Sequence, residues 1–204
     1  MLSIIIPTDE NAFGPAENLR GPGVELIFIP LASANTRAER INLGVERSNG
    51  EMILLHHPRS RLSKEAVQIL QDRKAEKFWG GFTHCFDLSH PLLRFTSFYS
   101  NHVRAPFGKV VYLDHCIFFH RSFWQPLPKV AIFEDTLLSK SLSHYGVPEI
   151  LPQVSLTSAI RFTKNGVWWQ SLLNQFLKIG YYLNISHERL NALYEKGLDL
   201  NAKK

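Results

Sequence analysis

The chain has 204 residues, of which 45% are hydrophobic and 20% charged, with a formal net charge of +5 at pH 7. This length and balance are typical of one globular domain, with room for a helical appendage. The two cysteines, Cys85 and Cys116, lack a CxxC spacing, which argues against a disulfide framework and favours a cytoplasmic setting. No run approaches the ~20 apolar residues of a membrane span. The positive charge includes no long Lys/Arg block, so we expect no nucleic-acid partner.

Three apolar runs in the first third of the chain predict buried strands. The runs cover residues 2–6, residues 24–30 and the stretch from Gly50 to His56, and proline or polar residues close each of them. Between the second and third runs we expect a helix over residues 34–48. Asn35 or Thr36 is expected to cap it, because their side chains can accept a bond from a free backbone N–H.

The rest of the chain alternates between helical and extended patterns. The predicted elements are helices at 63–77, 90–104, 132–145 and 168–183, and strands at 78–86, 109–119 and 149–154. A last short helix and a polar tail are expected over residues 184–201. Because strands and helices alternate, we expect an α/β fold with a mainly parallel sheet flanked by helices. We expect residues 1–165 to form the main domain and residues 166–204 to form a C-terminal helical segment packed on it.

The third predicted strand ends in polar residues, where an open α/β sheet binds its ligands. His56 and His57 lie at this end, and Pro58 cannot continue a strand because it lacks an N–H. Adjacent strand residues point to opposite faces, so at most one histidine faces a given site. Hard cations such as Mg²⁺ prefer oxygen ligands. The sequence therefore predicts no strong metal site here, with His56 as the only candidate ligand.

Two adjacent carboxylates, Glu134 and Asp135, open the helix expected at 132–145. Acidic side chains at a helix start stabilise the positive end of the helix dipole. A carboxylate is also what a transferase needs as a base that takes a proton from a hydroxyl. The residues alone leave both interpretations open, although neighbouring helical residues diverge by ~100°, so only one can face a given cleft.

Three further features each allow two interpretations. Asp114 and His115, inside an expected strand, form either a satisfied buried polar pair or a loop that contacts an acceptor. Arg161, beside two hydroxyl residues, lies either in a surface loop or at a diphosphate, for which its guanidinium is suited. The aromatic helix at 168–183 belongs either to the core or to a surface that contacts a membrane peripherally.

Several of these segments, in their order along the chain, resemble the family-2 glycosyltransferases. The segment S-I-I-I-P-T from Ser3 resembles the opening strand of that family, and T-R-A-E-R-I-N-L-G from Thr36 is similar to its R-A-x-Q-x-N-x-G helix. L-L-H from Leu54 matches the L-L-F-L-H-A-D-T strand of one bacterial subfamily. F-E-D from Phe133 and T-S-A-I-R from Thr157 match that subfamily's M-E-D helix and T-S-A-R-R segment.

The resemblance implies a GT-A fold, a nucleotide-diphosphate sugar as donor, and usually a divalent metal, Mn²⁺ or Mg²⁺. It assigns Asp135 as the base of an inverting transfer, so we expect Asp135 in the cleft and Glu134, the other catalytic candidate, with another partner. The nucleotide pocket would be lined by Pro7, Thr8, Glu10, Arg37 and His56. The acceptor or the diphosphate would be contacted by Asp114, His115 and Arg161.

Two departures from the family pattern shape these expectations. Pro58 stands where the family has its metal-binding aspartate, so we expect donor binding to be independent of a metal. One strand–helix unit that the family has after its second strand is missing here, so we expect a truncated nucleotide half. The strand at residues 24–30 should lie beside the strand at residues 2–6 or beside the one that ends at His56. No acidic side chain should be placed to accept from a base or ribose near Pro30. The leading hypothesis is sugar transfer to a saccharide or lipid-linked hydroxyl acceptor by a cytoplasmic or membrane-peripheral protein. The alternative is a degenerate, non-catalytic relative that binds a saccharide or a protein.

Overall fold

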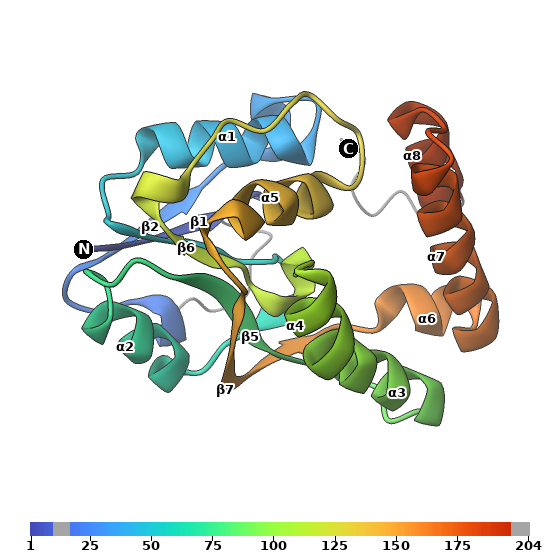
Figure 1. Cartoon of the computed structure of the whole chain (residues 1–204), viewed down its shortest axis with the longest axis horizontal. Coiled ribbons are helices and arrows are strands. Elements are labelled where there is room, and N and C mark those ends of the chain that lie inside the picture. Colours follow the sequence, from blue (N-terminus) through green and yellow to red (C-terminus); the bar gives the residue numbers. More distant parts are fainter. Residues whose placement is uncertain (10–16, 197–204) are drawn as a thin grey trace.

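A computed structural model describes residues 1–9 and 17–196 of the chain. The strands of this part form one curled sheet in the order β2-β1-β3-β6-β5-β7-β4 (Figure 1). Their bounds are β1 Leu2–Ile6, β2 Val24–Phe28, β3 Met52–Leu55, β4 Ser60–Arg61, β5 Trp79–Phe86, β6 Phe118–His120 and β7 Glu149–Thr157. The expected α/β class with helices flanking a sheet is confirmed.

The sheet is mixed rather than mainly parallel. β1 pairs in parallel with both β2 and β3. The strand expected at residues 24–30 thus lies beside the first strand, which is one of the two places predicted for it. β5 and β7 form the third parallel pair. β6 runs antiparallel to β3 and β5, and the unpredicted strand β4 runs antiparallel to β7. The amino-terminal half of the sheet thus consists of three parallel strands.

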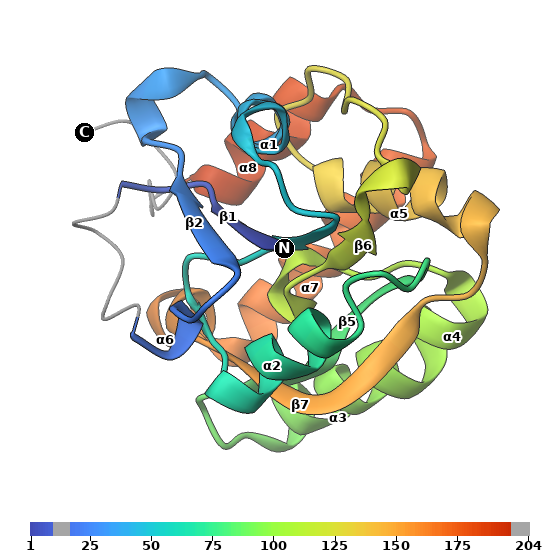
Figure 2. The same ribbon diagram turned by 90° about the vertical axis from the view of Figure 1, so that its left-hand side faces the viewer.

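Helices cover both faces of this parallel half (Figure 2). Ile5 and Leu55 point to one face, where they pack against α1 (Arg37–Arg47) and α5 (Glu134–Leu142). Ile4 and Leu54 point to the other face, toward α2 (Lys64–Asp72). Because neighbouring strand residues alternate in direction, the continuous apolar runs of β1 and β3 are buried on both sides.

The helix starts follow the capping signals in the sequence. Thr36 caps α1 through a capping box with Glu39, and Ser63 caps α2. The second helix ends at Asp72, five residues before its predicted end. At Gly44 the backbone of α1 approaches Ile5 so closely that a Cβ would collide with that side chain, so this position needs glycine.

The strand predicted over residues 109–119 is wrong for most of its length. Residues 113–115 form a turn of 3-10 helix, and only Phe118 to His120 pair in the sheet, as β6. Lys109 and Cys116 adopt left-handed backbone conformations, with φ of 51° and 53°, which interrupt an extended chain. Asp114 and His115 therefore project from a tight turn and not from the middle of a strand.

The segment between β5 and this turn is helical, as predicted. It contains α3 (Pro91–Tyr99), a π-helical turn (Ser100–Arg104) and α4 (Ala105–Gly108). β7 continues to Thr157, three residues beyond its predicted end, and α6 (Ile160–Asn165) follows where a loop was one of the two interpretations.

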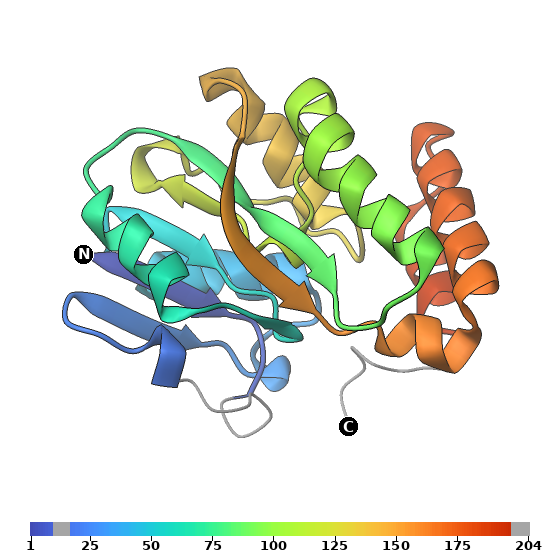
Figure 3. The ribbon, with the colours of Figure 1, turned by 90° about the horizontal axis from the view of Figure 1, so that it is seen from below.

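The C-terminal helices α7 (Val167–Tyr182) and α8 (His187–Glu195) lie at the end of the molecule opposite the N-terminus (Figures 1 and 3). Leu177 of α7 and Leu190 of α8 pack with Ile132, just before α5. The division at residue 165 stays a prediction. None of the helices in residues 1–9 and 17–196 is both long and apolar enough to cross a membrane.

Candidate functional site

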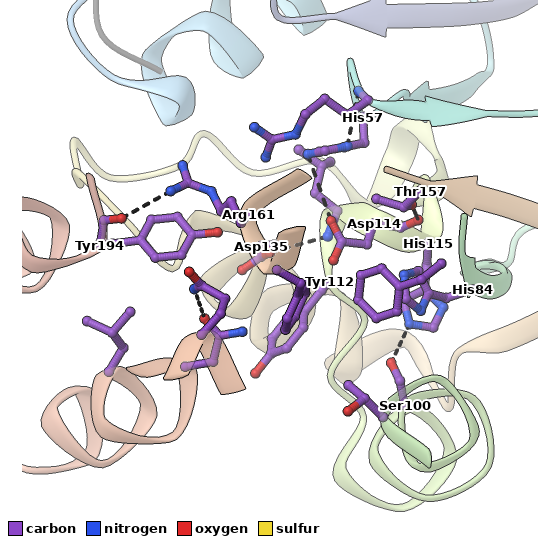
Figure 4. A pocket seen from close by; sticks show the side chains of 18 of the residues that line it. His57, His84, Ser100, Tyr112, Asp114, His115, Asp135, Thr157, Arg161 and Tyr194 are labelled. Atoms are coloured by element: carbon purple, nitrogen blue, oxygen red, sulfur yellow. Dashed lines mark hydrogen bonds and ion pairs between the residues drawn. The ribbon is translucent and has the colours of Figure 1, made fainter. Parts of the chain in front are cut away.

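A pocket lies where the carboxyl ends of the parallel strands point toward α7 (Figures 3 and 4). Its lining comes from segments far apart in the sequence. The lining includes Arg37, His57, Arg59, His84, Ser100, Arg104, Tyr112, Asp114, His115, Phe133, Asp135, Thr157, Arg161, Gln170, Asn174, Lys178 and Tyr194. The pocket therefore lies where the sheet topology predicts a ligand site.

The two adjacent carboxylates at the start of α5 diverge, as their helical positions require. Glu134 is 1% exposed and accepts a hydrogen bond from Nε of Arg37 in a buried ion pair. Asp135 lines the pocket, and its Oδ2 accepts a bond from the backbone N–H of Leu113 at 3.2 Å. The expected orientation of both residues is confirmed, while the catalytic role of Asp135 stays a prediction.

The environment of Asp135 disfavours its ionised form. Burial and the nearby charge of Glu134 raise the pKa of Asp135 to about 6, against the opposing influence of Arg37. A carboxylate with such a pKa is ionised at neutral pH and is more basic than an ordinary aspartate. It can accept a proton from a hydroxyl that enters the pocket.

The turn that carries Asp114 is fixed by hydroxyl groups from two strands. Ser155 and Thr157 of β7 donate to the carbonyl oxygen of Asp114 at 2.7 and 3.2 Å, and Ser60 of β4 donates to the same atom at 3.4 Å. The Asp114 carboxylate lies 3.8 Å from Nε2 of His57. Burial opposes its charge, but the interactions with His57, His84 and Arg59 outweigh this and lower the pKa of Asp114 to about 2.

His115 is buried beneath the pocket in a hydrogen-bond chain. Its Nδ1 lies 2.9 Å from the carbonyl oxygen of Phe82, which requires a proton on that nitrogen. Nε2 is then the acceptor, and Ser100 Oγ lies 2.6 Å from it. The guanidinium of Arg104 donates to Ser100 and stacks on Tyr112 at 3.6 Å from the ring centre. His115, Tyr112 and Arg104 all line the pocket, and the fully buried His115 forms part of its floor.

The cations of the pocket fall into two kinds. Arg37 is neutralised by Glu134, and Arg161 donates to Glu195 at 2.6 Å and to the carbonyl oxygen of Tyr194 at 3.0 Å. Arg104 donates to Ser100 and, at 3.3 Å, to the carbonyl oxygen of Val110. Arg59 and Lys178 make no side-chain hydrogen bond or ion pair with any residue in the described ranges, although Lys178 lies 5.7 Å above the Tyr112 ring. The latter two are the cations that a bound anion could use.

Sequence reasoning missed Lys178, because the helix that carries it is dominated by large apolar residues. The signal was present: Gln170, Asn174 and Lys178 recur every four residues, which places them on one side of a helix. All three line the pocket.

The predicted nucleotide-binding residues are not gathered in the pocket. Arg37 lines it, but Pro7, Thr8 and His56 are buried elsewhere and line neither of the two hollows identified. Glu10 lies outside the described residues. The expectation that no acidic side chain near Pro30 accepts from a base or ribose stays a prediction. In this region Oδ2 of Asp9 accepts a bond from the backbone N–H of Leu31 at 3.5 Å.

The side chains do not form a metal site in the part of the chain that the structure describes. No group of three or more His, Cys, Asp or Glu residues there is arranged to hold an ion. In the pocket, Asp114 faces His57, and Asp135 is held by the backbone of Leu113. The residues therefore do not fit the divalent ion that the family resemblance implies.

No family model matches the chain, and no curated protein matches it by sequence. Solved structures match its fold. TarS from S. aureus is a glycosyltransferase. The crystal structure of its residues 1–349 superposes with a TM-score of 0.50 at 10% identity, and the match covers 99% of this chain and 75% of that one. Another crystal structure of S. aureus TarS gives a TM-score of 0.51 at 11% identity, covering 78% and 35%. A complex of TarS 1–349 with UDP-GlcNAc gives 0.48 at 11% identity, covering 78% and 56%.

The fold is therefore glycosyltransferase-like. The chain spans about a third of one matched TarS chain and three quarters of another.

Proposed function

We propose that this protein is a glycosyltransferase that moves a sugar from a nucleotide-diphosphate donor to a hydroxyl acceptor. The observation that carries the proposal is the Asp135 carboxylate, which lines the pocket of a glycosyltransferase-like fold with its pKa raised to about 6. The buried pair of Glu134 and Arg37 beside it fixes the start of α5 and thereby the position of Asp135.

In the proposed reaction, ionised Asp135 accepts the proton of the acceptor hydroxyl. The freed oxygen attacks the anomeric carbon of the sugar, and the bond from that carbon to the diphosphate oxygen breaks. The nucleoside diphosphate leaves with the bonding electrons, so negative charge develops on it. Arg59 and Lys178, the pocket cations that make no side-chain hydrogen bond or ion pair with the described residues, would stabilise that charge.

The remaining predicted residues take supporting roles in this proposal. Asp114, with the rigid turn around it, would orient the acceptor, and His115 would hold the floor of the pocket. Arg161 would hold α8, through Tyr194 and Glu195, at the pocket wall. Pro7, Thr8, Glu10 and His56 would belong to a nucleotide subsite next to the pocket, in a main domain ending near residue 165. A cytoplasmic or membrane-peripheral location is part of the same proposal.

A second candidate is a non-catalytic relative that binds a saccharide in the same pocket. Pro58, at the position where the resembled family carries its metal aspartate, favours it. Both candidates predict ligand binding, and only the first predicts turnover.

Product analysis separates the two candidates. The protein is incubated in EDTA with UDP, GDP and dTDP sugars and with saccharide or lipid-linked acceptors, and the release of nucleoside diphosphate is measured. We expect release that depends on an acceptor and that the Asp135→Asn variant abolishes. Thermal stabilisation by a donor or a saccharide without any turnover would instead establish the binding protein.

A further inference from the structure

Helix α7 has its polar and apolar sides reversed relative to an ordinary surface helix. Its polar side chains Gln170, Asn174 and Lys178 line the pocket. The opposite side carries Trp168, Trp169, Leu172, Phe176 and Ile179, each more than half exposed. A surface helix normally buries its apolar side and shows its polar side to water. The outer side of α7 is therefore a candidate contact surface.

A second exposed apolar stripe runs along α3, the π-helical turn and α4. It consists of Phe95, Phe98, Tyr99, Val103 and Phe107, of which Phe107 is 82% exposed. Phe95, Tyr99, Val103 and Phe107 recur every four residues, and Phe98 lies three residues after Phe95, so the stripe follows one side of the helical segment.

The two stripes adjoin one another. Tyr99, Val103 and Phe107 line a second hollow together with Tyr182 of α7. At the other end of the stripes, the rings of His90 and Trp168 lie 6.2 Å apart. We call the two stripes together with Tyr182 the aromatic face. Contiguous exposed apolar surface of this extent marks a site of interaction.

The charged residues of the two segments that carry the aromatic face are all positive. No acidic residue occurs from 88 to 113 or from 150 to 187. Among their cations outside the pocket, Arg94 of the first segment and Lys164 of the second are exposed, and Lys109 is partly exposed. Tryptophan and tyrosine favour the interface between lipid and water, and lysine and arginine are attracted to anionic headgroups.

We propose that the aromatic face docks on the surface of a lipid bilayer that contains anionic lipids. The apolar side chains enter the boundary between headgroups and acyl chains, and the cations contact lipid phosphates. A second copy of this chain is a poorer occupant, because it would bring cations toward cations with no acidic residue between them.

The docking also suggests a class of acceptor, a consequence that rests on the proposed transferase function. The second hollow shares Arg104, Tyr112, Phe133 and Lys178 with the pocket that Asp135 lines, so the two cavities adjoin. An acceptor anchored in the bilayer could lie along the second hollow and present its hydroxyl to Asp135. The acceptor would then be an amphipathic, membrane-anchored molecule.

Vesicle flotation of the full chain tests the docking. One set of vesicles contains phosphatidylcholine alone, and the other contains phosphatidylcholine with phosphatidylglycerol. We expect the unmodified protein to bind the mixed vesicles about tenfold more tightly or better, with the difference reduced by salt. Absence of binding to the mixed vesicles would overturn the proposal.

Two charge substitutions locate the docking surface, and a third serves as their matched control. Phe107→Glu and Phe176→Glu each place one negative charge on the aromatic face, and each should weaken vesicle binding about tenfold or more. Val147→Glu makes the same change at a residue that is 58% exposed and outside the face, and it should leave binding unchanged. Equal losses in all three variants would contradict the proposal.

A measurement on the unmodified protein removes any dependence on how the variants fold. Brominated lipids in the mixed vesicles should quench tryptophan fluorescence, because Trp168 and Trp169 are exposed on the aromatic face. The other two tryptophans lie outside it: Trp79 is buried, and Trp124 packs against the core. Unquenched fluorescence would overturn the docking. Light scattering without lipid provides a second check. A dimer that Phe107→Glu and Phe176→Glu each convert to a monomer would also overturn the docking, because the aromatic face would then bind a second copy of the chain. Vesicle binding needs no turnover, so a protein that docks without transferring sugar rejects only the proposed function.

Discussion

The charges at the N-terminus of α5 and on the inner side of α7 differ in whether they have a counterion. At the N-terminus of α5, Glu134 is buried and paired with Arg37. On α7, Lys178 lines the pocket without an ion-pair partner among the described residues. A charge that already has its counterion contributes to the fold, whereas a charge that faces a cavity without one is available to a ligand. Asp135 joins the two regions, because it begins the same helix as Glu134 but faces the cavity.

Removing the base should have the largest effect. Asp135→Asn keeps the size of the side chain and removes its ability to take a proton, so the transfer rate should fall about 10²- to 10⁴-fold. Nucleotide release assays measure the loss, and Asp72→Asn, an exposed change on α2, is the control. A variant with more than about a tenth of the original rate would show that Asp135 is not the base.

Breaking the buried ion pair of Arg37 and Glu134 should destabilise the fold whether or not a ligand is bound. Arg37→Met leaves the Glu134 carboxylate buried and uncompensated, which should lower the free energy of unfolding by about 3 kcal/mol. Urea unfolding measures the change against Arg47→Met, an exposed substitution in α1. The double variant Arg37→Met/Glu134→Leu should recover much of the loss, because it removes the unpaired charge. A single-variant loss near zero would mean that the pair is not structural.

The pH dependence of transfer should follow the ionisation of Asp135. Its pKa is raised to about 6, and only the deprotonated form accepts a proton, so the rate should rise with pH through about 6 and level off above it. Arg37 lowers this pKa, so Arg37→Met should move the rise to higher pH. A rate that stays constant from pH 5 to 7 would contradict the assignment.

Removing the charge of Lys178, which has no ion-pair partner among the described residues, should weaken anion binding more than it lowers the free energy of unfolding. Lys178→Met should reduce affinity for a nucleoside diphosphate about tenfold, or about 1.4 kcal/mol, because one charge-assisted contact is lost. Burial and the nearby charge of Arg104 lower the pKa of Lys178 to about 8, so affinity of the unmodified protein should also decline above that pH. Calorimetry measures both effects. An unchanged affinity in Lys178→Met would assign the anion to other groups.

The first half of the fold could be predicted from local patterns, but much of the pocket could not. The strands of the parallel half and the caps Thr36 and Ser63 are encoded within a few residues, and so is the divergence of Glu134 from Asp135. The turn at Asp114 depends on hydroxyl groups from β4 and β7, more than 40 residues away. The contact of Arg161 with α8 likewise joins segments that no local pattern connects.

The central claim is that the pocket binds a nucleoside diphosphate through its own cations and not through a metal. The most direct measurement is calorimetric titration of the protein with UDP, GDP and dTDP, each in EDTA and in Mn²⁺. We expect at least one to bind, with dissociation constants that agree within about threefold in the two conditions and increase about tenfold in Arg59→Met. Binding that appears only with Mn²⁺, or no binding of any of the three, would contradict the claim.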